Sequence, residues 1–234
     1  MKRFRLQPLR EIVDLLFPRH CFHCSQLLLG DERYLCTHCW LHLPFTHNAA
    51  VVGNETEQHF QAHREVVAAM SLLHYRPDTA SRDLLHHIKY YGARKLALTM
   101  GMMIGEKLVE SGRFASVDLL VPVPLHPRRE RHRSYNQSEL LCRGIAKVLQ
   151  RPVSTGNLVR TVNTDSQTHM TAEERKENVK GAFRVRKPEL FQQRHILLVD
   201  DVITTGSTTA ACCDALIAAG VTRISIASLA LASS

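Results

Sequence analysis

Seven cysteines occur in the sequence, and four of them form two closely spaced pairs near its start. Cys21 and Cys24 make the first CxxC pair, and Cys36 and Cys39 make the second, eleven residues further on. Each CxxC turn can place two thiolates on one metal ion, and two such turns supply the four sulfurs that Zn²⁺ binds tetrahedrally. Four incidental cysteines or a single redox-active CxxC would not require this spacing. The pattern predicts a structural zinc site, because four cysteine ligands leave no open position for catalysis.

Two histidines, His23 and His38, lie inside these pairs and are alternative zinc ligands. We interpret them as solvated turn residues, because the cysteines already complete a set of four. The remaining cysteines, Cys142, Cys212 and Cys213, lie in predicted helices, where cysteine usually packs as a small apolar side chain. Metal chemistry is therefore assigned to the paired cysteines alone.

A second group of residues with chemical potential lies in the segment 196–208, which reads ILLVDDVITTGST. Its apolar start predicts a buried strand, and Asp200 and Asp201 stand at the carboxyl end of that strand. Two carboxylates in this place can accept hydrogen bonds from the 2′- and 3′-hydroxyls of a ribose. The loop that follows opens a helix and consists of Thr204, Thr205, Gly206, Ser207 and Thr208.

Backbone amides and hydroxyls of this loop can surround a phosphate at the positive end of the helix dipole. Gly206 allows the backbone to approach the anion closely. An ordinary strand followed by a capped helix would explain parts of the segment, but all thirteen positions together favour a site for a phosphorylated ribose. A P-loop NTPase is a poorer match, because no GxxxxGK[ST] motif occurs in the sequence.

Strands and helices that alternate along the chain must position these residues. Apolar runs predict strands over 66–75, 117–121, 195–199 and 221–231, and helical periodicity predicts helices over 84–91, 96–108, 141–148 and 207–219. Such alternation is typical of an α/β fold with a mostly parallel sheet flanked by helices.

The first part of the chain has a different character. A short amphipathic helix is expected over 9–17 and ends at Pro18. We expect the N-terminal helix and the zinc ribbon to occupy residues 1–45, and residues 46–65 to form a linker or an irregular cover. The main domain is then expected over 66–234.

Composition limits the partners and the compartment. The formal net charge is +8, which favours a polyanionic partner such as a phosphate compound, a nucleotide or a nucleic acid. No apolar stretch has the length of a membrane span, and the basic start lacks the apolar core of a signal peptide. We therefore expect no membrane insertion and a cytoplasmic location, where clustered thiols stay reduced and serve as metal ligands.

The segment 196–208 resembles the signature for phosphoribosyl pyrophosphate (PRPP) of the type I phosphoribosyltransferases: an apolar strand, two acidic residues and Thr-Thr-Gly-Ser-Thr. Three further segments resemble elements of the ComF competence family. They are IKYYG at 88–92, the proline-arginine loop and RSYNQ within 121–137, and a QT…R…N…AF pattern within 167–183. Ser134 stands where the family usually has Gly. With the N-terminal cysteines, the resemblance covers nearly the whole chain.

This resemblance implies a type I phosphoribosyltransferase-like domain that binds PRPP, with a small zinc ribbon before it. Asp200 and Asp201 would then be the residues at the reacting ribose, with Mg²⁺ bridging ribose and pyrophosphate oxygens. Arg128 and Arg129 would hold the pyrophosphate. Lys89 is a second candidate for this role, with a solvated lysine at a helix end as the alternative. The polar stretch 161–177 is expected to be a mobile flap.

Two functions remain open. In the first, which we favour, the protein is a ComF-like accessory protein of DNA uptake that binds PRPP and contacts single-stranded DNA through Arg129, Arg131, Arg133 and Tyr135. A helicase-like competence protein is then a further expected partner, and the alternative is that the arginines serve PRPP alone. In the second, the protein is an active phosphoribosyltransferase that transfers ribose 5-phosphate from PRPP to a base or amine. The sequence contains no clear base-recognition segment and no glutaminase domain.

Overall fold

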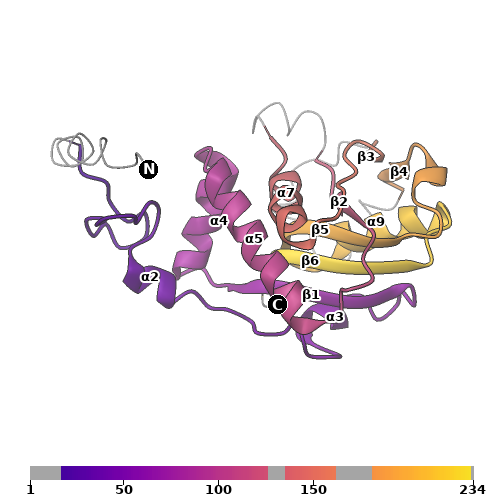
Figure 1. Ribbon diagram of the computed structural model, residues 1–234, viewed down its shortest axis with the longest axis horizontal. Helices are drawn as coiled ribbons and strands as arrows, with labels where there is room; N and C mark the ends of the chain where they lie inside the picture. Colours follow the sequence, from indigo (N-terminus) through magenta and orange to yellow (C-terminus); the bar gives the residue numbers. More distant parts are fainter. Residues whose placement is uncertain (1–16, 126–134, 162–180, 233–234) are drawn as a thin grey trace, which may run out of the picture.

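The computed structural model describes residues 17–125, 135–161 and 181–232 (Figure 1). Its main sheet has four strands in the order β1-β6-β5-β2, and every neighbouring pair is parallel. This confirms the mostly parallel α/β sheet that the alternating pattern predicts. The strands are β1 (Val66–Tyr75), β2 (Leu119–Pro122), β5 (His195–Ile203) and β6 (Arg223–Ala232).

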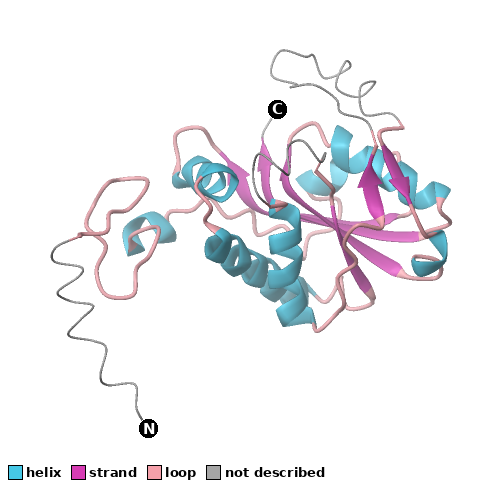
Figure 2. Ribbon diagram, turned by 90° about the horizontal axis from the view of Figure 1, so that it is seen from above, coloured by secondary structure: helices cyan, strands magenta, loops and turns pink. Residues whose placement is uncertain are grey.

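Helices cover both faces of this sheet (Figure 2). Successive residues of a strand point to opposite faces, and β5 shows the result. Leu197 and Val199 pack in one apolar cluster with the helices on one face, whereas Ile196 and Leu198 pack in a second cluster on the other face. The first cluster includes α4 (Ala80–Tyr90), α5 (Arg94–Ser111) and α7 (Gln137–Leu149), and the second includes α9 (Ser207–Ala218).

Close contact between α5 and α7 fixes the start of α7 beside the sheet. A Cβ atom added to Gly144 would lie 2.4 Å from the carbonyl oxygen of Leu98, and one added to Gly101 would lie 2.3 Å from that of Leu141. Only glycine permits this approach of two backbones. The crossing holds the first turn of α7, with Ser138, against the carboxyl end of β5.

A short antiparallel pair, separate from the main sheet, is formed by β3 (Leu158–Arg160) and β4 (Phe183–Val185). The buried residues Leu158 and Phe183 belong to the same apolar cluster as α9. The pair therefore stands on the α9 side of the sheet.

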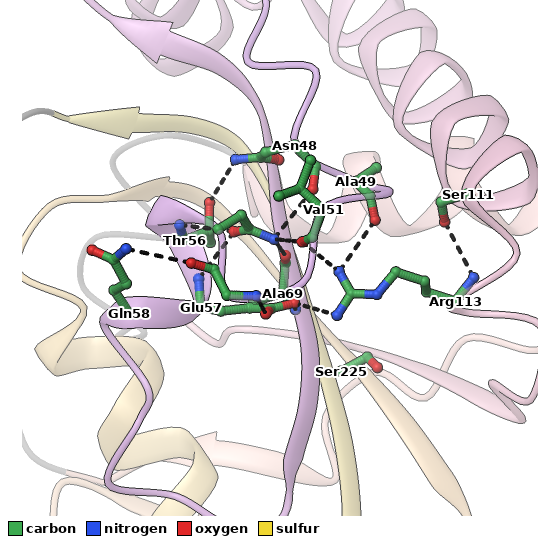
Figure 3. Close-up of polar contacts among 12 residues, drawn as sticks. Asn48, Ala49, Val51, Thr56, Glu57, Gln58, Ala69, Ser111, Arg113 and Ser225 are labelled. Carbon is green, nitrogen blue, oxygen red and sulfur yellow. Dashed lines mark hydrogen bonds and ion pairs between the residues drawn. The ribbon is translucent and has the colours of Figure 1, made fainter.

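Residues 46–65 are packed against the sheet, so this stretch is the irregular cover and not a free linker (Figure 3). The side-chain amide of Asn54 donates to the carbonyl of Ala69 in β1 at 2.9 Å. The Glu57 carboxylate accepts from the amide of Ala69 at 3.1 Å and from the guanidinium of Arg113 at 2.6 Å. Sequence periodicity missed this packing because it rests on side-chain bonds to distant backbone groups.

Two short helices complete the N-terminal part, α2 (Thr37–Leu41) in the ribbon and α3 (Glu55–Gln58) in the cover. The helix expected over 9–17 falls almost entirely outside the described residues. Across the three described ranges, none of the helices has the length and apolar composition of a membrane span.

Candidate functional site

A cavity of about 500 Å³ opens at the carboxyl ends of β5 and β2. In parallel α/β sheets, ligands bind at this edge, where loops leave neighbouring strands. Most of its walls come from residues 200–209, which span the end of β5 and the start of α9, from the side of α4 that includes Arg82 and Lys89, and from Arg160 of β3. The sequence-predicted carboxylates and loop are thus brought into one cavity with three cationic side chains, those of Arg82, Lys89 and Arg160.

Asp200 and Asp201 occupy different surroundings in this cavity. The Asp200 side chain is buried, and its carboxylate accepts from the amide of Asp201 at 2.8 Å, the hydroxyl of Thr209 at 3.0 Å and that of Ser138 at 3.4 Å. Burial, followed by the negative charge of Asp201, raises the pKa of Asp200 to about 7. Hydrogen bonds within the protein therefore occupy the Asp200 carboxylate, and Asp201 is the more accessible of the two acceptors.

Lys89 is paired across the cavity with Asp201. Its Nζ lies 3.1 Å from Oδ2 of Asp201, and only 23% of its side chain is exposed. This position differs from that of a solvated lysine at a helix end, the alternative that the sequence left open. The ammonium group therefore lies beside the carboxylate of Asp201 and offsets part of its charge.

The loop after Asp201 has the geometry of an anion cradle. Gly206 has a φ of +75°, in the left-handed region, and the helix α9 begins at the next residue, Ser207. A Cβ atom at position 206 would lie 3.2 Å from Cβ of His59, so the site is both conformationally and sterically suited to glycine. The first N–H groups of a helix have no partner within it, and they favour an anion at this point. Thr204, Thr205, Ser207 and Thr208 line the cavity around it.

Sequence reasoning missed Arg160, which lines the cavity from β3. Its guanidinium carbon lies 5.4 Å from the ring centroid of Phe183, so the cation–π contact holds the arginine in place. A three-residue strand has too little alternation to be recognised, which is why no signal pointed to this residue. His86 and Tyr90 of α4 also line the cavity and were not predicted.

Several predicted site residues fall outside the described residues. They are Arg128, Arg129, Arg131 and Arg133, and nearly all of the flap expected over 161–177. Tyr135 follows this arginine segment and is described. Its hydroxyl donates to the carbonyl of Ile88 in α4, and the guanidinium carbon of Arg94 lies 4.9 Å from its ring centroid. One face of the ring is therefore covered by an arginine, and Tyr135 itself is bonded to α4.

The four cysteines of the ribbon converge as predicted. Their Sγ atoms all lie within 4.8 Å of one another, and Sγ of Cys24 is 3.6 Å from Sγ of Cys36. Tetrahedral zinc with Zn–S bonds of about 2.3 Å requires sulfurs about 3.8 Å apart, so the residues fit the ion. Burial acts to raise the pKa of Cys21, but bonds from the amides of Cys24, Cys36 and His23 lower it to about 6, which favours a thiolate at this ligand. Burial and the neighbouring sulfurs raise the pKa of Cys39, so its thiolate depends on the charge of the metal ion.

The two histidines of the CxxC pairs have other partners. The ring of His38 stacks on that of His42, with centroids 4.2 Å apart. Nδ1 of His23 lies 2.8 Å from Oδ2 of Asp83 in α4, so this histidine is not merely a solvated turn residue. The remaining cysteines, Cys142, Cys212 and Cys213, are buried in α7 and α9, as expected for core side chains.

We expect the replacement Asp200→Asn to stabilise the fold above neutral pH. The folded pKa of about 7 exceeds the ordinary aspartate value of 3.8, so the folded state binds the proton more tightly than the unfolded state does. The stability that the protonated carboxyl contributes is therefore lost as pH rises from about 4 through 7. The variant should match the parent at pH 4 and exceed it at pH 8, by at most about 1.4 kcal/mol per unit of pKa difference. Chemical denaturation at both pH values measures this, and equal stability of the two proteins at pH 8 would contradict it.

Comparison with known proteins agrees with both parts of this description. Residues 137–234 match the family model described as a phosphoribosyl transferase domain, and residues 12–55 match the one described as a double zinc ribbon domain. The "DNA utilization protein YhgH" of Escherichia coli (strain K12) is 31% identical over 209 residues, which are 88% of this chain and 87% of that protein. "Competence protein F" of Haemophilus influenzae is 41% identical over 93 residues, 39% of this chain and 40% of that protein.

Among solved structures, a glutamine PRPP amidotransferase from B. subtilis covers 61% of this chain and 30% of its own, at 16% identity and a TM-score of 0.41. That similarity adds nothing to the assignment, which rests on the near full-length relative, the transferase domain and the four-cysteine ribbon. The chain is a member of the ComF family, to which DNA utilization protein YhgH and Competence protein F belong.

Proposed function

We propose that this protein binds PRPP together with Mg²⁺ in the cavity at the carboxyl end of β5, and that it acts as an accessory protein in the utilization of DNA. The observation that carries the proposal is the joining of two carboxylates, a helix-opening hydroxyl loop and three cationic side chains in one cavity of about 500 Å³. Each of these groups suits one part of PRPP: the ribose diol, the 5-phosphate and the pyrophosphate.

In the proposed complex, the 5-phosphate lies in the loop 204–208, where amides and hydroxyls bind it. The ribose hydroxyls donate to Asp201, while Asp200 orients the Asp201 backbone through the bond to its amide. The pyrophosphate binds Lys89, whose ammonium group exchanges its contact with Asp201 for one with the ligand. Arg128 and Arg129 also bind the pyrophosphate. Mg²⁺ bound with the ligand would offset the negative charge of its pyrophosphate beside Asp200 and Asp201.

The role in DNA utilization is supported by the names of the two relatives and by the net charge of +8. Single strands would contact Arg129, Arg131 and Arg133, without marked sequence preference, because charges read the backbone and not the base edges. A helicase-like competence protein is the proposed partner, and the cytoplasm, where thiols stay reduced, is the proposed compartment.

A second candidate function is phosphoribosyl transfer to a base or amine with release of pyrophosphate. It is favoured by the wall of the cavity that α4 forms, where His86 and Tyr90 present planar side chains. Their rings are neighbours, with centroids 4.9 Å apart. Aromatic rings at this place are suited to a planar acceptor.

Calorimetric titration with PRPP tests the proposal. We expect one site per chain, tighter binding with Mg²⁺ than without it, and weaker binding of ribose 5-phosphate and of pyrophosphate, each of which fills only part of the cavity. Absence of PRPP binding with Mg²⁺ present would contradict the proposal.

Two assays separate the candidate roles. Pyrophosphate release from PRPP in the presence of bases or amines would favour the transferase. Fluorescence anisotropy with labelled single strands would favour the accessory role if affinity falls by about 0.7 log units per neutralised phosphate for each log unit of salt. No single-strand binding at low salt would exclude direct contact with DNA.

A further inference from the structure

The helix α4 joins the zinc ribbon to the cavity. Its buried residues, Leu84 and Ile88 among them, pack on the sheet, and Lys89 lies on the side that lines the cavity. Asp83 and His87, one helical turn apart, lie on the side that meets the ribbon. Figure 1 shows the ribbon beside α4 at one end of the molecule.

Two residues between the zinc ligands Cys21 and Cys24 make the contacts with α4. The ring of Phe22 stacks on the ring of His87, with centroids 4.2 Å apart and planes 19° apart. His23 bonds to Asp83 through Nδ1 and Oδ2 at 2.8 Å. Both contacting side chains therefore belong to a turn whose shape is set by the metal ligands on either side of it.

The backbone of this turn is also held within the ribbon. The amide of Phe22 donates to the carbonyl of Tyr34 at 3.1 Å, and the amide of Cys21 donates to that of Gln26 at 2.8 Å. Zinc bound by the four sulfurs would fix this arrangement further. The Phe22 ring is thus presented to α4 from a rigid support.

The contacts continue along α4 towards the cavity. His87 stacks in turn on Tyr91, with centroids 4.8 Å apart, and its Nδ1 lies 2.9 Å from the carbonyl oxygen of Asp83. Lys89 lies between His87 and Tyr91 in the last turn of the helix and reaches Asp201. The ribbon contacts therefore extend along α4 from Asp83 in its first turn to His87, two residues before the cavity lysine.

A helix of this size depends on its neighbours for its position. α4 has 11 residues, and its N-cap residue, Thr79, makes no side-chain capping bond. Isolated helices shorter than about 12–15 residues are marginal in water, so packing decides where such a helix lies. A small displacement of a binding group is enough to weaken its contact with a ligand.

We infer that the zinc knuckle 21–24 positions Lys89 for the pyrophosphate of the ligand by docking Phe22 and His23 on α4. Of the residues in this chain of contacts, Phe22, His23 and His87 are positioning residues, and Lys89 alone meets the ligand. The inference rests on the proposed PRPP site for the identity of the ligand, and on the observed contacts for the coupling. It assigns the ribbon a role in the ligand affinity of the main domain.

The test uses the full chain with the double replacement Phe22→Ala and His23→Ala, which removes both contacts and keeps all four cysteines. We expect one zinc per chain to remain, the amides of 83–91 to exchange hydrogen faster, and PRPP to bind roughly tenfold more weakly. Binding of ribose 5-phosphate, which has no pyrophosphate for Lys89, should be unchanged. Phe22→Tyr with His23 intact keeps the stacked ring and should retain parental affinity.

The control is Leu29→Ala, at a ribbon side chain that is 67% exposed, and it should change none of these values. If the double variant loses zinc, Asp83→Ala with His87→Ala removes the same contacts from the α4 side. Unchanged exchange in 83–91 with zinc retained would overturn the inference, as would unchanged PRPP affinity. Failure of the parent protein to bind PRPP would instead overturn the proposed ligand, and the exchange data would then decide the coupling alone.

Discussion

Replacing Cys21 or Cys39 by Ser should release zinc and unfold the ribbon. Each sulfur is one of four that lie within 4.8 Å of one another, and a hydroxyl is a poor substitute for a thiolate ligand. Zinc binding at structural sites of this kind contributes about 10–16 kcal/mol, so a ribbon of this length should not remain folded without the ion. Metal analysis and near-ultraviolet circular dichroism of the purified variants measure the two effects.

The parent protein should hold one zinc ion per chain. Residues 12–55 match a double zinc ribbon, yet this stretch contains only the four cysteines of a single site. His38→Ala is the matched control, because His38 lies inside the second pair but stacks on His42 and should be dispensable for the metal. Protein purified without chelator and found free of zinc, or a cysteine variant that keeps the metal, would contradict the assignment.

Removing the two carboxylates near the end of β5 should abolish the rise in melting temperature that PRPP causes. In the double variant Asp200→Ala and Asp201→Ala, the ribose hydroxyls lose their acceptors, at a cost of about 1–3 kcal/mol for each group. The melting temperature of the parent should rise when PRPP and Mg²⁺ are added, because the ligand binds only the folded state. That of the double variant should stay unchanged.

Two further variants make this result specific. Asp201→Asn alters the more accessible carboxylate alone and leaves the bonds of buried Asp200 in place, so it should lose most of the response without loss of the fold. Asp214→Ala removes one negative charge from α9 at a side chain that is 68% exposed, and it should respond like the parent. A double variant that PRPP stabilises as much as it does the parent would show that the ligand site lies elsewhere.

The features that the sequence predicted well are those set by local order. The spacing of two CxxC pairs is enough to indicate a zinc site. Asp200, Asp201 and the loop 204–208 are close in sequence, so they must also lie close together at one end of the buried strand. The alternation of strands and helices likewise indicates a parallel sheet, because each crossover helix returns the chain to the end of the sheet at which the strands begin.

Features that depend on contacts between residues far apart in the sequence could not be predicted from local patterns. From the sequence, Lys89 was either a pyrophosphate-binding residue or a solvated lysine at a helix end. The contact of Lys89 with Asp201 depends on the tertiary packing that brings α4 to the carboxyl end of β5. His23 and Asp83 are 60 residues apart, and a histidine within a CxxC pair gives no sign of such a partner. Arg160 and the cover formed by 46–65 depend in the same way on tertiary packing.

The most direct test of the account is the crystal structure of the protein with PRPP and Mg²⁺. The account predicts electron density for the 5-phosphate within hydrogen-bonding distance of the loop 204–208, for the ribose hydroxyls beside Asp201, and for the pyrophosphate towards Lys89. Density for PRPP at another place on the molecule, with this cavity free of ligand, would contradict it.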